Sequence, residues 1–116
     1  PTFMLPFWSR DRTRGKLLNL EHLVAKQTLK TAQTYGLNDR GALLKGMRAD
    51  INIIDYDKIS LTKPSLSYDL PAGGKRLIQK SNGYNHTFVK GIEVSHNGEF
   101  TGELPGKLIR GNQSIN

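Results

Sequence analysis

The stretch at residues 36–59, GLNDRGALLKGMRADINIIDYDKI, decides how the chain is organised. Gly36 ends a helical pattern, as glycine commonly does at the residue after a helix. Beyond it, residues 42–44 form a short strand candidate that is closed by Lys45 and Gly46, and residues 50–56 carry the strongest strand pattern of the chain. The stretch therefore predicts a change from helices to short strands and turns.

A carboxylate, Asp50, stands immediately before the apolar run Ile51-Asn52-Ile53-Ile54. It can be catalytic, a metal ligand or structural, and the residues around it favour the structural role. A carboxylate at a strand entrance accepts backbone N–H bonds, here from the turn at residues 46–48. Arg40 or Arg48 would supply the countercharge. The predicted structural turn comprises Arg40, Gly41, Gly46 and Asp50.

Upstream of this stretch the sequence is helical. Asn19 is placed to cap a helix that begins at Leu20, and Leu20, Leu23 and Val24 share one apolar face at helical spacing. A kink is expected near Thr28 and Leu29.

Downstream, prolines and glycines predict mostly loop over residues 57–76. Residues 87–95 are expected to form a strand with a bulge or close backbone approach at Gly91. The Asn97-Gly98 pair predicts a tight hairpin turn, because both central residues of a type I′ turn need positive φ. Helices followed by strands define an α+β fold.

Composition limits the possible functions. The 116 residues suit one domain or a piece of a larger one, and the lack of cysteine excludes disulfides and thiol chemistry, which favours a reducing cytoplasm. No apolar run approaches the roughly 20 residues of a membrane helix.

The net charge of +7 is concentrated near the N-terminus. The candidate contacts for nucleic acid or another polyanion are Arg10, Arg12, Arg14 and Lys16. A solvated loop, or a patch that pairs with acidic groups on neighbouring structure, is the favoured interpretation of these four residues.

Motifs that carry chemistry are largely missing from the sequence. His22, His86 and His96 form no HxH, HExxH or His-x3-His spacing, so each is interpreted as an ordinary surface or edge histidine. The sequence has no GxSxG elbow and no GxxxxGK[ST] loop. We therefore assign no catalytic residue and no metal ligand to this chain.

Longer patterns carry a family resemblance. Residues 36–59 are similar to the segment G-L-x-D-R-G-x-L-x-x-G-x-x-A-D near the C-terminal end of amidohydrolases. Residues 68–111, YDLPAGGKRLIQKSNGYNHTFVKGIEVSHNGEFTGELPGKLIRG, resemble the ending of the N-acyl-D-amino-acid deacylase (D-aminoacylase) branch. Residues 5–37 resemble the helices that precede that ending. The resemblance covers roughly residues 4–111, and its AGGKRL and TGELPGKLIRG blocks are the specific part.

The resemblance implies a much longer parent enzyme, a (β/α)8 barrel with zinc and a small β-sandwich built from both chain ends. Residues 1–38 would be the terminal helical segment of the barrel, and residues 39–116 the C-terminal part of a composite sandwich with an antiparallel or mixed β region. The zinc ligands and the catalytic aspartate of the family map onto no residue here. The remainder of the parent chain is the implied partner, and Asp50 matches the structural aspartate of the Gly-x-x-Ala-Asp turn.

Three functions compete at this stage. The chain is the C-terminal structural segment of a zinc-dependent hydrolase of N-acyl-D-amino acids and is inactive alone, or it is a free-standing module that binds a polyanion, or it is an assembly domain. Exposed strand edges also suggest self-association of the isolated chain. The sequence leaves open whether the parent acts on a related amide or a cyclic ureide.

Overall fold

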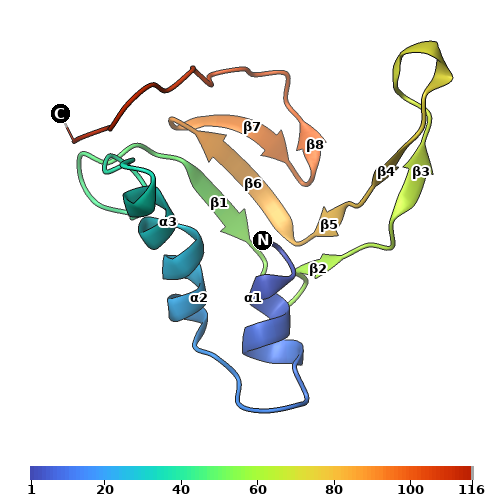
Figure 1. Cartoon of the computed structure of the whole chain (residues 1–116), viewed down its shortest axis with the longest axis horizontal. Helices are drawn as coiled ribbons and strands as arrows, with labels where there is room; N and C mark the ends of the chain where they lie inside the picture. The colour runs from blue at the N-terminus through green and yellow to red at the C-terminus, as the bar shows by residue number, and fades with distance from the viewer. Residues whose placement is uncertain (116) are drawn as a thin grey trace.

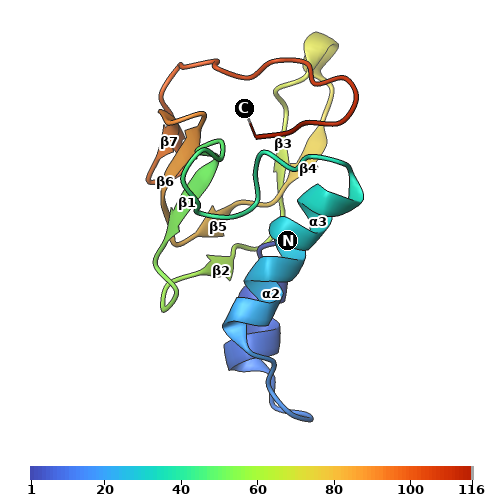
Figure 2. The same ribbon diagram turned by 90° about the vertical axis from the view of Figure 1, so that its left-hand side faces the viewer.

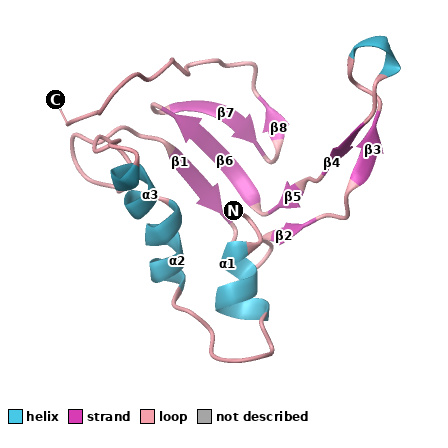
Figure 3. Ribbon diagram, viewed as in Figure 1, coloured by secondary structure: helices cyan, strands magenta, loops and turns pink. Residues whose placement is uncertain are grey.

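The computed structural model describes residues 1–115, in which helices come first and strands follow (Figure 1). The helical part contains α1 (Met4–Pro6), which continues into a π-helical turn (Phe7–Asp11), then α2 (Leu20–Gln27) and α3 (Leu29–Thr34). The strands form small antiparallel sheets (Figure 3). The α+β prediction is therefore confirmed for the described residues.

The main sheet has four strands in the order β1-β6-β7-β8, all antiparallel. They are β1 (Ile51–Ile54), β6 (Tyr84–Val89), β7 (Ile92–His96) and β8 (Glu99–Phe100). Two short ladders continue away from it. They pair β2 (Ser60–Leu61) with β5 (Ser81–Asn82), and β3 (Ser65–Ser67) with β4 (Arg76–Ile78). A single 3₁₀ turn (Pro71–Gly73) closes the outer ladder.

Two tight turns fold residues 84–100 back and forth. Asn97 and Gly98 have φ values of 49° and 83°, which confirms the predicted hairpin turn between β7 and β8. The single strand predicted over residues 87–95 is wrong. Lys90 and Gly91, with φ values of 53° and 78°, form a second turn that separates β6 from β7. Glycine at position 91 is therefore a turn residue and not a bulge inside a strand.

The expected strand at residues 42–44 is also wrong. Gly41 and Gly46 bracket this segment with φ values of 92° and 89°, and its backbone makes a turn in which Met47 N–H donates to the carbonyl of Leu44. Leu43 and Leu44 are 81% and 65% exposed, so the pair has no sheet to face. The expected loop over residues 57–76 does contain short strands. Each of the ladders that these strands form spans only two or three residue pairs.

The helical predictions hold in outline. Helix α2 begins at Leu20, and the expected kink lies at Thr28, where φ is −112° and ψ is −90°. Asn19 occupies the N-cap position but makes no side-chain cap bond, so the predicted cap is wrong in that detail. On the predicted apolar face Leu23 is buried, whereas Val24 is 42% exposed.

The core is small and lies where the helices meet the start of the β region. Leu5, Leu23 and Ile59 form its buried centre. Around them pack the partly buried Met4, Trp8, Leu20, Ile54, Tyr56 and Tyr84. Because this core draws on both sides of residue 38, the division into residues 1–38 and 39–116 stays a prediction.

The chain is open for its length. Its Cα radius of gyration is 16.5 Å, compared with about 13 Å expected for a compact domain of this size. The β3–β4 ladder projects as an arm, and the segment after β8 runs back over the sheet towards α3, where Leu37 forms a bridge with Gln113 (Figures 1 and 2). Within residues 1–115, no helix has the length and apolar character needed to cross a membrane.

A substitution at Gly83 tests how closely the backbone packs against the core residue Ile59. Gly83 has a φ of 88°, and a Cβ there would lie 2.7 Å from the backbone N and Cα of the fully buried Ile59. We predict that Gly83→Ala destabilises the chain by clearly more than about 2 kcal/mol in urea unfolding, because the steric clash adds to the strain of the positive φ. Gly98→Ala is the matched control, since its φ is 83° but no atom lies within 4 Å, and it should cost only about 1–2 kcal/mol of conformational strain. Equal losses in the two variants would contradict this account of the packing.

Candidate functional site

Asp50 joins the loop before β1 to the turn between β6 and β7. Its Oδ1 accepts hydrogen bonds from the Lys90 backbone N–H at 2.9 Å and from Arg48 Nε at 2.7 Å. Its Oδ2 accepts one from Arg40 Nη1 at 3.2 Å. The backbone N–H of Gly91 donates to the carbonyl of Ala49 at 2.9 Å, beside the same contact. The carboxylate therefore meets two cations and one backbone donor.

The donors differ in part from those expected. Both Arg40 and Arg48 reach Asp50, but the backbone donor is Lys90, which follows it by forty residues, and not the turn at residues 46–48. Among the described residues, no backbone N–H of that turn donates to the Asp50 carboxylate. The backbone N–H of Arg48 donates instead to the carbonyl of Asp39, at 2.7 Å.

The other members of the predicted turn support this arrangement. Arg40 forms a bidentate ion pair with Asp39, with Nε–Oδ1 and Nη2–Oδ2 distances of 2.8 and 2.9 Å. These hydrogen bonds from Arg40 hold the pKa of Asp39 below its ordinary value. Gly41 packs against α3, because a Cβ there would lie 2.9 Å from Leu29 Cα. Gly46 supplies positive φ at the far end of the loop.

The basic patch is partly engaged within the chain. Arg10 donates to the backbone carbonyls of Tyr56, Asp57 and Ile59, and it pairs with the neighbouring carboxylate of Asp11. This arginine therefore joins the first helical turns to the loop after β1.

The other three cations of the patch lie nearer the solvent. The guanidinium of Arg12 lies over the Trp8 ring, 4.5 Å from its centroid, and donates to the carbonyls of Arg14 and Lys16. The Arg14 and Lys16 residues themselves are exposed. Polyanion binding by this patch stays a prediction.

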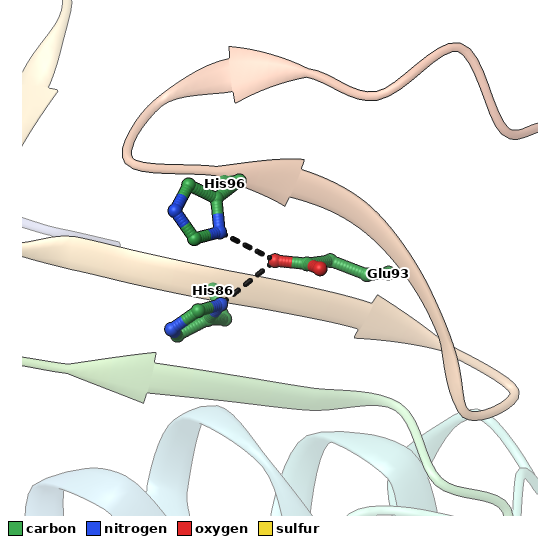
Figure 4. A group of neighbouring side chains, drawn as sticks. All are labelled: His86, Glu93 and His96. Carbon is green, nitrogen blue, oxygen red and sulfur yellow. Dashed lines mark hydrogen bonds and ion pairs between the residues drawn. The ribbon is translucent and has the colours of Figure 1, made fainter.

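His86, Glu93 and His96 form a cluster on one face of the main sheet (Figure 4). The Nδ1 atoms of His86 and His96 lie 2.7 and 3.0 Å from the same carboxylate oxygen, Oε1 of Glu93. The two imidazole rings meet edge to face with centroids 4.6 Å apart. The hydrogen bond from His86, and then that from His96, holds the pKa of Glu93 below its ordinary value. Histidine and carboxylate in this arrangement can bind a proton or a divalent cation.

Sequence reasoning missed this cluster because it treated the histidines singly. His86 and His96 are cross-strand partners only because the chain turns at Lys90 and Gly91. Glu93 and His96 are three residues apart and would face opposite sides of a regular strand. Phe88 pairs with Glu93 and Thr87 pairs with Ser95, so one extra residue, Val94, is inserted and returns His96 to the face of Glu93. The Lys90-Gly91 turn was the sequence signal available.

Comparison with known proteins places this α+β segment in a family. The model of the family described as "Amidohydrolase family" matches residues 2–94, so the chain belongs to the amidohydrolase family. The chain is 33% identical over 101 residues to an N-acyl-D-glutamate deacylase and 34% identical over 101 residues to an N-acyl-D-aspartate deacylase, both of Alcaligenes xylosoxydans xylosoxydans. The resemblance to the D-aminoacylase branch is thereby confirmed.

An allantoinase of Deinococcus radiodurans is also similar, with 35% identity over 94 residues. These alignments cover 87%, 86% and 80% of the chain but only 19%, 18% and 20% of the three relatives. The chain therefore spans about one fifth of the length of the curated relatives it matches. No solved structure matches the chain significantly.

The Asp50 contacts give a mutational prediction. We expect Asp50→Ala to destabilise the chain by about 1–3 kcal/mol in urea unfolding, because it leaves two half-buried arginines and one backbone N–H without their acceptor. Asp50→Asn should lose less, since its amide oxygen still accepts one bond. Asp57→Ala is the control; that exposed carboxylate makes no side-chain hydrogen bond to the described residues, and its loss should change stability by less than about 0.5 kcal/mol. Equal effects at positions 50 and 57 would contradict the joining role.

Acid should destabilise the fold. Hydrogen bonds from Arg10, Arg40, Lys58, Arg76 and the histidine pair lower the pKa values of five carboxyls: Asp11, Asp39, Asp55, Asp69 and Glu93. A lowered pKa in the folded chain adds stability that is fully present above the unfolded value of about 4 and is lost as pH falls through the folded value. We predict that the melting temperature is level near neutral pH and falls steadily below about pH 4. A melting temperature that stays constant down to about pH 2 would contradict these pairs.

Proposed function

We propose that this chain is the structural C-terminal segment of a metal-dependent amidohydrolase that hydrolyses N-acyl-D-amino acids, and that its catalytic residues lie outside the chain. The observation that carries the proposal is the pair of alignments to D-amino-acid deacylases, which span most of this chain but under a fifth of each relative. In the reaction the amide bond would be cleaved by water, which releases a carboxylate and the free D-amino acid.

The resemblance implies zinc in the parent enzyme, with ligands on barrel strands that precede this segment. Bound zinc supplies an activated water and polarises the amide carbonyl. The residues of this chain would act by supporting that barrel. We assign Asp50, with Arg40, Gly41 and Gly46, the structural task of fixing the loop between α3 and β1 against the β6–β7 turn.

Exposed apolar side chains support the proposal that the remainder of the parent chain packs against this segment. Val24 is exposed although it lies on the apolar face of α2, and it lines, with Ile51 of β1, a hollow of about 400 Å³. Leu77, Leu104 and Leu108 are 72%, 84% and 79% exposed. These exposed apolar side chains, together with the edge strands β1 and β8, suit burial by further strands, as a composite β-sandwich would provide. The lack of cysteine suits a reducing compartment such as the cytoplasm.

The proposal is tested with the parent protein that contains this segment, the same protein with the segment deleted, and the isolated 116-residue chain. Release of D-glutamate and D-aspartate from their N-acetyl derivatives is measured, with the L-isomers as controls. We predict activity of the parent, none of the isolated chain, and a loss of at least about 100-fold on deletion. A barrel that keeps full activity without the segment, or hydrolysis by the segment alone, would overturn the structural assignment.

A further inference from the structure

We propose that His86, Glu93 and His96 form a binding site for a divalent transition-metal ion of the Zn²⁺ class on the main sheet. The proposal goes beyond the hydrolase assignment, because it needs only side chains of β6 and β7. It rests on the convergence of two imidazole nitrogens on one carboxylate oxygen (Figure 4).

The distances suit a tetrahedral ion after a small adjustment. The three donor atoms lie within 4.8 Å of one another, and each Nδ1 is 2.7 or 3.0 Å from Oε1 of Glu93. Around Zn²⁺, with bonds to nitrogen and oxygen of about 2.0–2.1 Å, neighbouring ligand atoms are about 3.3 Å apart. The two nitrogen–oxygen separations therefore need to lengthen by about 0.3–0.6 Å, and the nitrogen–nitrogen separation, which is at most 4.8 Å, needs to reach about 3.3 Å. Side-chain torsions can supply movements of this size.

The chemistry of the donor set also fits. In the metal-free chain, both Nδ1 atoms compete for one carboxylate oxygen, and each bond requires a proton on Nδ1. In the bound state each neutral imidazole carries its proton on Nε2 and presents the Nδ1 lone pair to the ion. One dication then lies between the three side chains, in place of the two Nδ1 protons. Two imidazoles and a carboxylate are ligands that Zn²⁺ accepts together.

The backbone holds the three ligands in place. His86 lies on the central strand β6, between Ile53 of β1 and His96 of β7, so its position is fixed on both sides. The extra residue Val94 brings Glu93 and His96 to one face. Bulges of this kind re-aim side chains at functional positions.

The site remains open on one side. The side chains of His86 and Glu93 are 34% exposed and that of His96 is 55% exposed, so an ion can enter from solvent. The fourth position is available to water.

The test uses Zn²⁺ in calorimetric titrations of the 116-residue chain, with the histidine ring nitrogens followed by NMR. We predict one bound ion per chain, a shift of the Nδ1 signals of His86 and His96, and a higher melting temperature with added Zn²⁺. The variants His86→Gln and His96→Gln should each weaken binding by at least about tenfold, since even the loss of supporting groups around a metal costs about 10–100-fold.

His22→Gln is the matched control, because it removes an exposed histidine from α2 and leaves the sheet intact. This variant should bind Zn²⁺ as tightly as the unsubstituted chain does. Three results would each overturn the proposal. They are an absence of saturable binding by the unsubstituted 116-residue chain, binding that survives in the double variant His86→Gln/His96→Gln, and weakening by His22→Gln equal to that by the other two substitutions. Far-ultraviolet circular dichroism of every variant ensures that folded chains are compared.

Discussion

The contact between Asp50 and the turn at Lys90 is the constraint on which the β region depends. It joins residues that are forty positions apart and places two arginines of the preceding loop on the same carboxylate. Without it, the loop that leads from α3 and the hairpin of β6 and β7 would be connected mainly through the ladder between β1 and β6. A partly exposed ion pair alone contributes little, but here the carboxylate also satisfies a backbone donor at a turn.

The second constraint is the small core around Ile59. The chain after β1 turns back at once, with the backbone N–H groups of Lys58 and Ile59 donating to the carbonyl of Asp55, and Gly83 lies directly against it. Arg10 ties the same segment to the first helical turns. These contacts connect the helical part to the sheet. Yet the described residues include only four buried apolar side chains in all, which is few for a chain of this length. The open shape and the exposed leucines follow from that shortage and suit a segment that is completed by further chain.

The sequence predicted the features that depend on local backbone chemistry. Gly36 after the helix, the break at Thr28 and the Asn97-Gly98 turn were all visible because glycine and asparagine accept positive φ and because the apolar spacing is periodic. It missed the turn at Lys90 and Gly91, since lysine seldom adopts positive φ, and with that turn it missed the pairing of His86 with His96. The false strand at residues 42–44 shows the converse error. An apolar run without a partner strand remains a loop, and local preference cannot reveal whether a partner exists.

The central claim is that this sheet is completed by the rest of an amidohydrolase chain, and hydrogen exchange tests it most directly. Backbone amide exchange in β1 and β8, the two edge strands of the main sheet, should be compared between the isolated chain and the parent protein. We predict that these amides exchange at least about tenfold more slowly in the parent, because further strands or loops cover both edges there. Equal exchange rates at both edges in the two proteins would contradict the claim and make the segment an independent unit.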